Sequence, residues 1–403
     1  IPGVTDDNGT LKLAGSGFNV LLNGKHYQMD AAQLNALLKS LPASRLKHAE
    51  VMYTTPARYE VRGASINLDI ASDSSQPDGW QGELTGAWNQ EHEAMWSERG
   101  AFLYHHNKLD IDFNYEHDHG KSYRTTDETS LHALGDGTTH DIVTDEAQRS
   151  RDHKHLWRMG LDYAFTENHR LSLSYTGSYN TEHAREDVTG NVTAANAYRT
   201  KKKMHDVMLD YQLPTGTTLN AEYTYYDTPS TQRLASTLPT GELHFNTDEH
   251  QRINRWKFHL GQEHSLAGGW GLNYGVRYSL TNDHSWQAFT STGDNTAANP
   301  TNSYSRQNED IVNVYAGTNG KIGQKVNFEA SLAAEYYHSP AWHQWNVYPT
   351  LSLTYIPSSS HVLQLNFSSD KKFPDYWTLQ SFTAYSNGGY NEVVGNPSLK
   401  PSS

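Results

Sequence analysis

The sequence predicts an all-β transmembrane barrel, an antiparallel up-and-down meander of about 13 strands. Three observations predict it. Apolar and polar residues alternate with a period of two from residue 80 onward, and tight turns alternate with long polar connections. Aromatic residues are abundant, with 25 Tyr, 10 Trp and 11 Phe among 403 residues. Because only alternate residues of such a strand face lipid, the fold needs no long apolar run.

The alternation is clearest in the segment KLDIDFNYEHDHG, where Leu109, Ile111 and Phe113 share one face and Asp110 and Asp112 share the other. The same pattern recurs in NRWKFHLG and KVNFEASLAAEYY. A charged face is costly against a second sheet but harmless in water, which favours a barrel over a soluble β-sandwich. Tyr and Trp near the ends of the apolar faces suit the boundary between hydrocarbon and headgroups.

The connections predict the two ends of the barrel. Short turns are expected at HHNK, TENHR, LPTGT, SLAGG, GKIGQK and IPSSSH. Longer polar loops are expected near residues 120–150, 183–202, 228–250, 284–306 and 371–400. Tight turns at one end and long loops at the other are typical of outer-membrane barrels.

The first 72 residues predict a separate small α/β unit. Strands are expected in TLKLAG, FNVLLNGK, RLKHAEVMY and ASINLDI, with Asn23-Gly24 as a tight turn. A helix is expected from the N-cap Asp30 to Leu41, because leucines recur there at helical spacing. Pro56 fixes a bend after the third of these strands. Residues 73–79 are interpreted as a linker, and residues 80–403 as the barrel.

Composition and motifs exclude several classes of function. The formal charge of −13 disfavours nucleic acid as a partner, because phosphate binding needs a basic face. The chain has no cysteine, so thiolate metal sites and disulfides are absent. No pattern for a nucleophile, a phosphate-binding loop or a metalloprotease occurs, so we predict that the protein is not an enzyme and holds no cofactor.

Histidine is in excess, at 22 residues, and two dense pairs stand on neighbouring predicted strands. His117 and His119 share the face of Tyr115, and His153 and His155 share the face of Trp157. Antiparallel pairing brings these pairs close together at one rim of the barrel. Imidazole is a common ligand for zinc, copper and iron, so metal or haem capture is one interpretation. The other is that these are ordinary polar residues at a solvated interface.

Two segments carry a family resemblance. The stretch from NVLLNGK to GASINLDI resembles the second half of the plug domain of TonB-dependent outer-membrane receptors, especially those of Bacteroides-type bacteria. The matching plug positions include Asn23, Gly24, Pro56 and Gly63. DKKFPDYWTLQ and VVGNPSLKPSS resemble a barrel motif of the same family, at Asn396, Pro397, Leu399 and Pro401. Ala64-Ser65 stands where the family usually has a glycine-rich run.

The resemblance implies a bacterial outer-membrane barrel of about 22 strands that encloses its plug. It implies that this chain is part of a longer protein, with the C-terminal part of the plug at residues 1–72 and the N-terminal part of the barrel at residues 80–403. The implied function is active uptake of a scarce nutrient, such as a metal chelate or siderophore, haem, cobalamin or a glycan. The implied partners are outer-membrane lipid, a small-molecule or oligomeric nutrient, and a TonB-type energy-coupling protein that binds a segment this chain lacks.

Alternatives remain open from the sequence. A surface-binding or adhesion barrel with a permanent plug has the same patterns, and a soluble β-protein shares the alternation. The lumen-facing charges of the wall have two interpretations. They shape a selectivity field, or, as we expect, they pair with plug residues such as Arg45, Lys47, Arg58 and Arg62. Aromatic residues in predicted loops are candidates to hold a bulky ligand: Trp286, Trp342, Tyr385 and Tyr390.

Overall fold

The fold was established from a computed structural model. It describes residues 4–7, 10–13, 17–26, 46–70, 78–133, 137–166, 168–238, 241–292, 302–358, 361–374, 376–379, 383–386, 389, 391–396 and 398–402. The helix predicted for residues 30–41 lies outside these residues, as do Arg45, Tyr390 and Pro397. Within the described residues, no helix is sufficiently long and apolar to span a bilayer.

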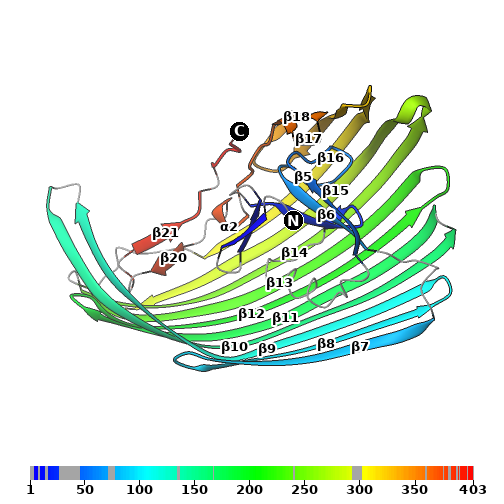
Figure 1. The fold of residues 1–403 in the computed structure, drawn as a ribbon. Helices are drawn as coiled ribbons and strands as arrows, with labels where there is room; N and C mark the ends of the chain where they lie inside the picture. The colour runs from blue at the N-terminus through cyan, green and yellow to red at the C-terminus, as the bar shows by residue number, and fades with distance from the viewer. Residues whose placement is uncertain are drawn as a thin grey trace.

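One antiparallel sheet of 13 strands, β7 to β19, dominates the molecule, and each strand pairs with its neighbours in the chain. This confirms the predicted all-β meander and the predicted number of strands (Figure 1). The strands are β7 (Gly79–Gln90), β8 (Ala94–His106), β9 (Leu109–Ala133), β10 (Thr139–Thr166), β11 (His169–Gly190), β12 (Thr193–Gln212), β13 (Thr217–Leu238), β14 (Gly241–Leu266), β15 (Trp270–Thr292), β16 (Ser303–Ile322), β17 (Val326–His338), β18 (His343–Ser358) and β19 (His361–Ser368). A 3-10 turn, η2 (Ala267–Gly269), joins β14 to β15.

The long polar segments are largely strand and not loop, which corrects the prediction. Strand β9 continues to residue 133 and strand β10 begins at residue 139, although a loop was expected near 120–150. Strand β15 likewise runs to Thr292, well into the loop expected near 284–306. The reason is that backbone pairing satisfies N–H and C=O groups whatever the side chains are, so a ladder extends beyond the membrane with polar residues on both faces.

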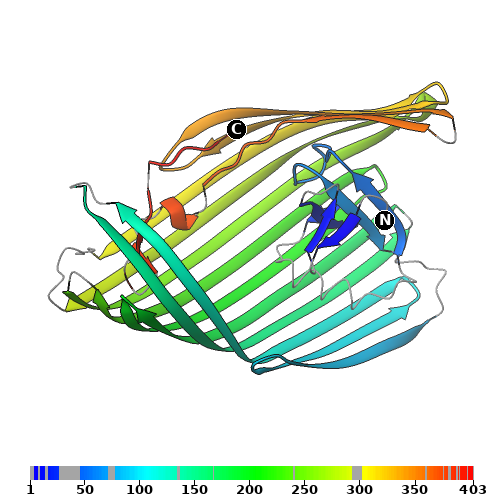
Figure 2. The ribbon, with the colours of Figure 1, turned by 60° about the vertical axis from the view of Figure 1, so that its left-hand side comes forward.

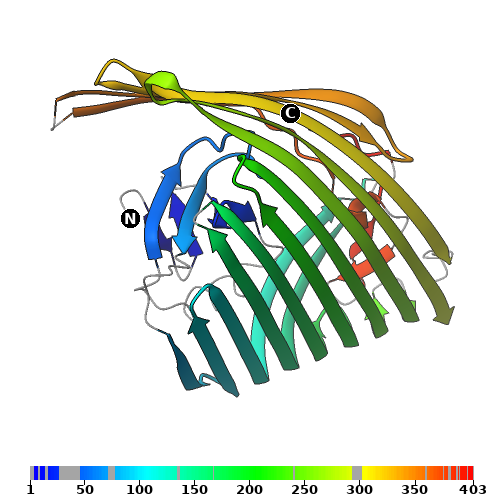
Figure 3. The same ribbon diagram turned by 90° about the vertical axis from the view of Figure 1, so that its right-hand side faces the viewer.

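The sheet is curved (Figures 2 and 3), and its two faces carry different side chains. Because successive residues of a strand point to opposite faces, the register assigns each side chain to a face. Large apolar side chains such as Trp256, Phe258 and Leu332 remain more than 40% exposed on the convex face. On the concave face, polar groups such as Glu222 and Asp283 are buried.

The N-terminal unit lies against the concave face near the tight-turn ends of the strands (Figures 1 and 3). Its described part contains a sheet with the order β4-β3-β6-β5, in which β3 and β6 are parallel. The strands are β3 (Asn19–Leu22), β4 (Lys25–His26), β5 (Leu46–Met52) and β6 (Ser65–Ile70). Strands β1 (Val4–Asp7) and β2 (Thr10–Leu13) form a separate hairpin.

Two predicted turn residues have the backbone that their positions require. Asn23 and Gly24 join β3 to β4 with φ values of 51° and 78°, the left-handed conformation of a two-residue hairpin turn. The Gly24 amide also donates a 2.8 Å hydrogen bond to Oδ1 of Asn67. A side chain at Gly24 would crowd the Tyr59 ring, at 3.3 Å.

The C-terminal segment lies against the concave face at the opposite end of the strands from the N-terminal unit (Figures 1 and 2). It contains the short helix α2 (Tyr376–Leu379) and the hairpin β20 (Thr383–Ser386) and β21 (Asn391–Val394). Two backbone hydrogen bonds between Lys372 and Ser402, of 2.8 and 2.9 Å, join the two ends of this segment. In the predicted barrel motif, Asn396 accepts a turn hydrogen bond from the Ser398 amide.

We expect an arginine on the convex face to destabilise the protein in a bilayer. Leu332 is 51% exposed at mid-strand, and Leu332→Arg should lower the free energy of unfolding by about 2–4 kcal/mol. The matched control is Ser352→Arg on the concave face, where Ser352 stands opposite Glu329 in the register and should tolerate a cation. Urea unfolding from lipid vesicles measures both. Equal losses in the two variants would contradict the assignment of faces.

Candidate functional site on the concave wall

A loop of the N-terminal unit, residues 53–64 between β5 and β6, makes most of the described contacts with the wall. Thr55 closes the base of this contact loop, because its amide and hydroxyl both donate to the Gly63 carbonyl, at 2.9 and 2.6 Å. The Tyr59 amide donates to the Pro56 carbonyl at 3.0 Å. Gly63 has a φ of 80°, which favours glycine at this position. The loop is therefore a closed, internally bonded projection.

Two arginines of the contact loop pair with carboxylates on β17. Arg58 donates to Oε1 of Glu329, and Arg62 donates to Oε2 of Glu335 at 2.6 Å. Arg58 and Arg62 are among the basic residues that we expected to pair with the wall, and the expectation is confirmed for both. Lys25, which the sequence did not single out, makes a further ion pair of 2.7 Å with Asp210 on β12.

The Glu335 carboxylate bonds to residues of both the contact loop and the wall. Besides the Arg62 pair, it accepts hydrogen bonds from Nδ2 of Asn313 at 3.1 Å and from the Tyr348 hydroxyl at 3.2 Å. The Arg62 guanidinium also lies 3.6 Å from the centroid of the Tyr348 ring, within cation–π distance. Because Glu335 is only 7% exposed, removal of Arg62 leaves a carboxylate with little water to solvate it.

The wall also binds the backbone of the contact loop. The Arg277 guanidinium donates to the carbonyls of Ala57, at 2.9 Å, and Arg58. In return, the Ala57 amide donates to Oγ of Ser331 at 2.8 Å. Ala57 packs beside a small buried cluster of the wall, formed by Tyr315, Ala333 and Tyr348.

Glu60 stands at the tip of the contact loop, bonded to Lys257 of β14. Partial burial of Glu60 disfavours its ionised form, but the ammonium of Lys257 and the guanidinium groups of Arg277 and Arg255 outweigh this effect. Together they lower the pKa of Glu60 from 4.5 to about 2. Burial lowers the pKa of the neighbouring His26, so His26 is neutral near pH 7. The Glu60 carboxylate is thus ionised at neutral pH.

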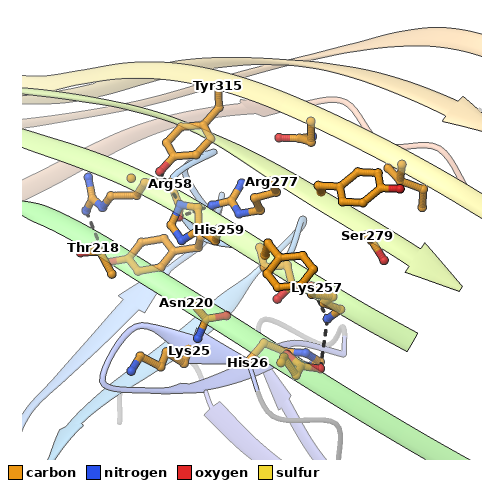
Figure 4. Close-up of a pocket in the computed structure, with 18 of the residues that line it drawn as sticks. Lys25, His26, Arg58, Thr218, Asn220, Lys257, His259, Arg277, Ser279 and Tyr315 are labelled. Atoms are coloured by element: carbon orange, nitrogen blue, oxygen red, sulfur yellow. Dashed lines mark hydrogen bonds and ion pairs between the residues drawn. The ribbon is translucent and has the colours of Figure 1, made fainter. Parts of the chain in front are cut away.

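A polar cavity of about 570 Å³ lies between the N-terminal unit and the wall. Figure 4 shows Lys25 and His26 on one side and Lys257, His259, Arg277 and Tyr315 on the strands that face them. Six basic and six acidic side chains line it: Lys25, Arg58, Arg62, Arg255, Lys257 and Arg277, and Glu60, Asp210, Glu222, Glu263, Glu309 and Glu335. Acidic and basic side chains are therefore balanced in number around this polar space.

The aromatic residues proposed from the sequence do not gather at one place. Tyr385 is buried in a cluster with Leu234, Leu243 and Phe245, and Trp342 contacts Tyr337 and Phe373. Trp286 lies within strand β15 and not in a loop, and its ring meets His250 edge-on. Ligand binding by Trp286, Trp342, Tyr385 and Tyr390 stays a prediction.

The C-terminal hairpin is fixed to the opposite end of the wall by two glutamines that the sequence did not suggest. The Gln287 side chain donates to the Thr383 carbonyl at 2.8 Å and accepts from the Thr383 amide at 3.1 Å. Gln232 donates to the Tyr385 carbonyl at 3.3 Å. No local pattern marks these glutamines, because each is one polar residue among many on the concave face.

The four predicted histidines are brought together, on the convex face. His117 stands opposite His155 and His119 opposite His153 in the register of β9 and β10. The sequence analysis missed Glu98 of β8, which stands opposite His117. The tight turn between β8 and β9 sets the register that brings Glu98 opposite His117. The sequence pattern alone does not give this register. Metal binding by this group stays a prediction.

Residues 213–403 match the model of a family described as "Outer membrane protein beta-barrel family". This match covers slightly under half of the chain and includes the strands from β13 onward together with the predicted barrel motif. No curated protein sequence matches the chain.

Solved structures with the same fold are outer-membrane receptors and transporters. A mutant of the ferric enterobactin receptor PfeA from Pseudomonas aeruginosa is 14% identical, with a TM-score of 0.55, over 100% of this chain and 63% of that one. The copper transporter OprC is 12% identical, with a TM-score of 0.54, over 94% and 60%. A double mutant of the Serratia marcescens hemophore receptor HasR is 13% identical, with a TM-score of 0.52, over 99% and 64%.

Together these findings indicate a β-barrel protein of the bacterial outer membrane. Its fold is that of the TonB-dependent receptors, which confirms the resemblance predicted from the sequence. The chain spans a little under two thirds of the length of PfeA.

We expect Arg62→Ala to loosen the N-terminal unit from the wall. The loss of the ion pair to the buried Glu335 should cost about 1.5–3 kcal/mol, which corresponds to about 10–100-fold faster local opening. Hydrogen exchange of peptides from residues 46–70 measures it. The control is Arg252→Ala, whose partner Asp227 belongs to the wall, at 3.3 Å. Unchanged exchange in Arg62→Ala would show that this pair does not hold the unit.

We expect Glu60 to remain ionised in moderately acidic solution. Because its pKa is lowered to about 2, its contribution to docking is complete above its ordinary pKa of 4.5 and is lost only as the pH falls through about 2. The difference infrared spectrum between the wild type and Glu60→Gln should keep its carboxylate band at about pH 3.5. Lys257→Gln should move the titration upward. A wild-type band that disappears near 4.5 contradicts this.

Proposed function

We propose that this protein is an active-uptake receptor of the outer membrane whose N-terminal unit is a displaceable plug. In this assignment residues 1–72 are the C-terminal part of the plug, residues 73–79 a linker, and residues 80–403 the N-terminal part of the barrel. The observation that carries the proposal is the contact between the unit and the wall. Ion pairs to Glu329, Glu335 and Lys257 surround a polar cavity there.

The chemistry of this contact supports displacement. Separating an apolar contact of the same size exposes hydrocarbon to water, whereas the charged groups of an ion pair regain hydration when they separate, which offsets part of the attraction that is lost. Among the described residues, the apolar part of the contact is small and centres on Ala57 beside Tyr315 and Tyr348. A pulling force on the N-terminal unit therefore acts against a set of separate polar bonds, each of which is replaced by hydration when it breaks.

The cargo proposed is a scarce nutrient that is too large for a porin. The proteins of like fold are a ferric enterobactin receptor, a copper transporter and a hemophore receptor, which supports a metal chelate, siderophore or haem before cobalamin or a glycan. The energy source proposed is a TonB-type protein that acts on the plug. The rival function, a surface-binding or adhesion barrel, has the same fold but a plug that never moves.

A disulfide between the plug and the wall distinguishes the two. The chain has no cysteine, and the Ala57 amide lies 2.8 Å from Oγ of Ser331. We expect Ala57→Cys combined with Ser331→Cys to cross-link under oxidation. In cells that express the full-length protein, the cross-link should abolish energy-dependent accumulation of radiolabelled ferric siderophore or haem, and a reductant should restore it.

Each single cysteine variant is the matched control and should transport normally under both conditions. Surface binding of the cargo should survive the cross-link, because the outer loops are unchanged. If the wild type accumulates no cargo, or if the cross-linked protein accumulates it as fast as the wild type, the displaceable plug is refuted.

A further inference from the structure

A compact group of nitrogen and oxygen ligands lies on the convex face of strands β8 to β10. Glu98 belongs to β8, His117 and His119 to β9, and His153 and His155 to β10. The register places Glu98 opposite His117 and His117 opposite His155, so these side chains share one face of the sheet. By the same register, Arg99 and Glu116 point to the other face, and they bond to each other there.

The distances within this group fit a metal ion. Oε2 of Glu98 lies 3.2 Å from Nδ1 of His117, and Oε1 lies 3.1 Å from Nε2 of His119. One ligand atom from each of Glu98, His117 and His119 lies within 4.8 Å of the other two. Two ligands of a tetrahedral zinc ion stand about 3.3 Å apart, so small side-chain rotations bring all three atoms into one coordination sphere.

The imidazole rings are already ordered for this role. The rings of His117 and His155 stack with centroids 4.2 Å apart and planes 4° from parallel, and the His117 and His119 rings stack at 4.6 Å. The Tyr115 hydroxyl lies 2.8 Å from Nδ1 of His155 and fixes that ring. Among the described residues, the buried Nε2 of His117 has no hydrogen-bond partner, and it is Nδ1 of that ring that faces the Glu98 carboxylate.

The type of ligand selects the type of ion. Two imidazoles and one carboxylate with a further open position favour zinc, copper or nickel over calcium or magnesium, which prefer oxygen ligands alone. Without a metal ion, the single carboxylate of Glu98 cannot form an ion pair with every imidazole of the group. One divalent ion can bind the carboxylate and two of the imidazoles at the same time.

The position of the group separates it from the transport path. The N-terminal unit and the cavity lie on the concave face, whereas Glu98 and the histidines share the convex face with Trp96, Tyr115 and Trp157. These aromatic residues are of the kind that lines the boundary between lipid and water. An ion bound there is a structural ion at the outer surface and not the cargo.

We propose that Glu98, His117 and His119 bind one divalent transition-metal ion on the convex face, with His155 stacked behind His117 as a positioning residue. The ion ties strand β8 to strand β9 at the membrane boundary. It stabilises the wall independently of any cargo that passes inside.

Calorimetric titration of the full chain in detergent with Zn²⁺ alone tests the proposal. We expect one saturable site per chain in the wild type, with an affinity at least about 10-fold lower in the double variant His117→Gln and His119→Gln. Glu98→Gln should also weaken binding at least about 10-fold while it keeps a side chain of the same shape. Circular dichroism establishes that each variant is folded.

The matched control is His264→Gln. His264 also faces the convex side and pairs with a tyrosine, Tyr274, at 3.2 Å, but it is remote from the group. This variant should bind Zn²⁺ as the wild type does. Zn²⁺ should also raise the unfolding temperature of the wild type and the control but not of the double variant. Equal affinity in the double variant and the wild type, or no saturable binding in the wild type, overturns the proposal.

Discussion

The structure depends on one constraint: every strand of the 13-stranded sheet separates hydrocarbon from water with a single thickness of backbone. The ladder of N–H···O=C bonds between neighbouring strands satisfies backbone groups that hydrocarbon would leave without a partner. Side chains then sort by parity alone, with Trp256 and Phe258 on the lipid side and Lys257 between them on the wet side. The concave side of such a wall is polar, so a domain that packs against it must do so through hydrogen bonds and ion pairs.

The N-terminal unit meets that interior with charge. Arg58, Arg62 and Glu60 on one closed loop find complementary groups on β14 and β17, and Arg277 binds the loop backbone. Because each charged group needs its own partner, these bonds fix the position of the N-terminal unit on the wall. In the described part of the chain, they do so without a large hydrophobic core between the two. Specificity of position without a large apolar contact is what the displaceable plug proposed above requires.

The alternation of side chains between the two faces also places polar groups on the convex face. Where the strands leave the membrane, the outward positions no longer need to be apolar, and β8 to β10 place a carboxylate and four imidazoles there. Strand pairing continues far past this boundary, which is why the polar segments extend the sheet and do not form loops. The C-terminal hairpin is then bound inside the extended wall by Gln232 and Gln287.

Neighbouring residues in the sequence predict the number of strands, their lipid and water faces and the tight turn at Asn23-Gly24. The expectation that Arg58 and Arg62 pair with the wall rests on the plug assignment and is one of two alternatives. Only the tertiary structure decided which carboxylate each arginine meets, that Glu98 joins the histidines, and that Tyr385 is buried and not displayed in a loop. The physical reason is register. A period of two assigns a face to each side chain. The offset between neighbouring strands depends on the length of every turn, and this offset decides which distant residues come within bonding distance.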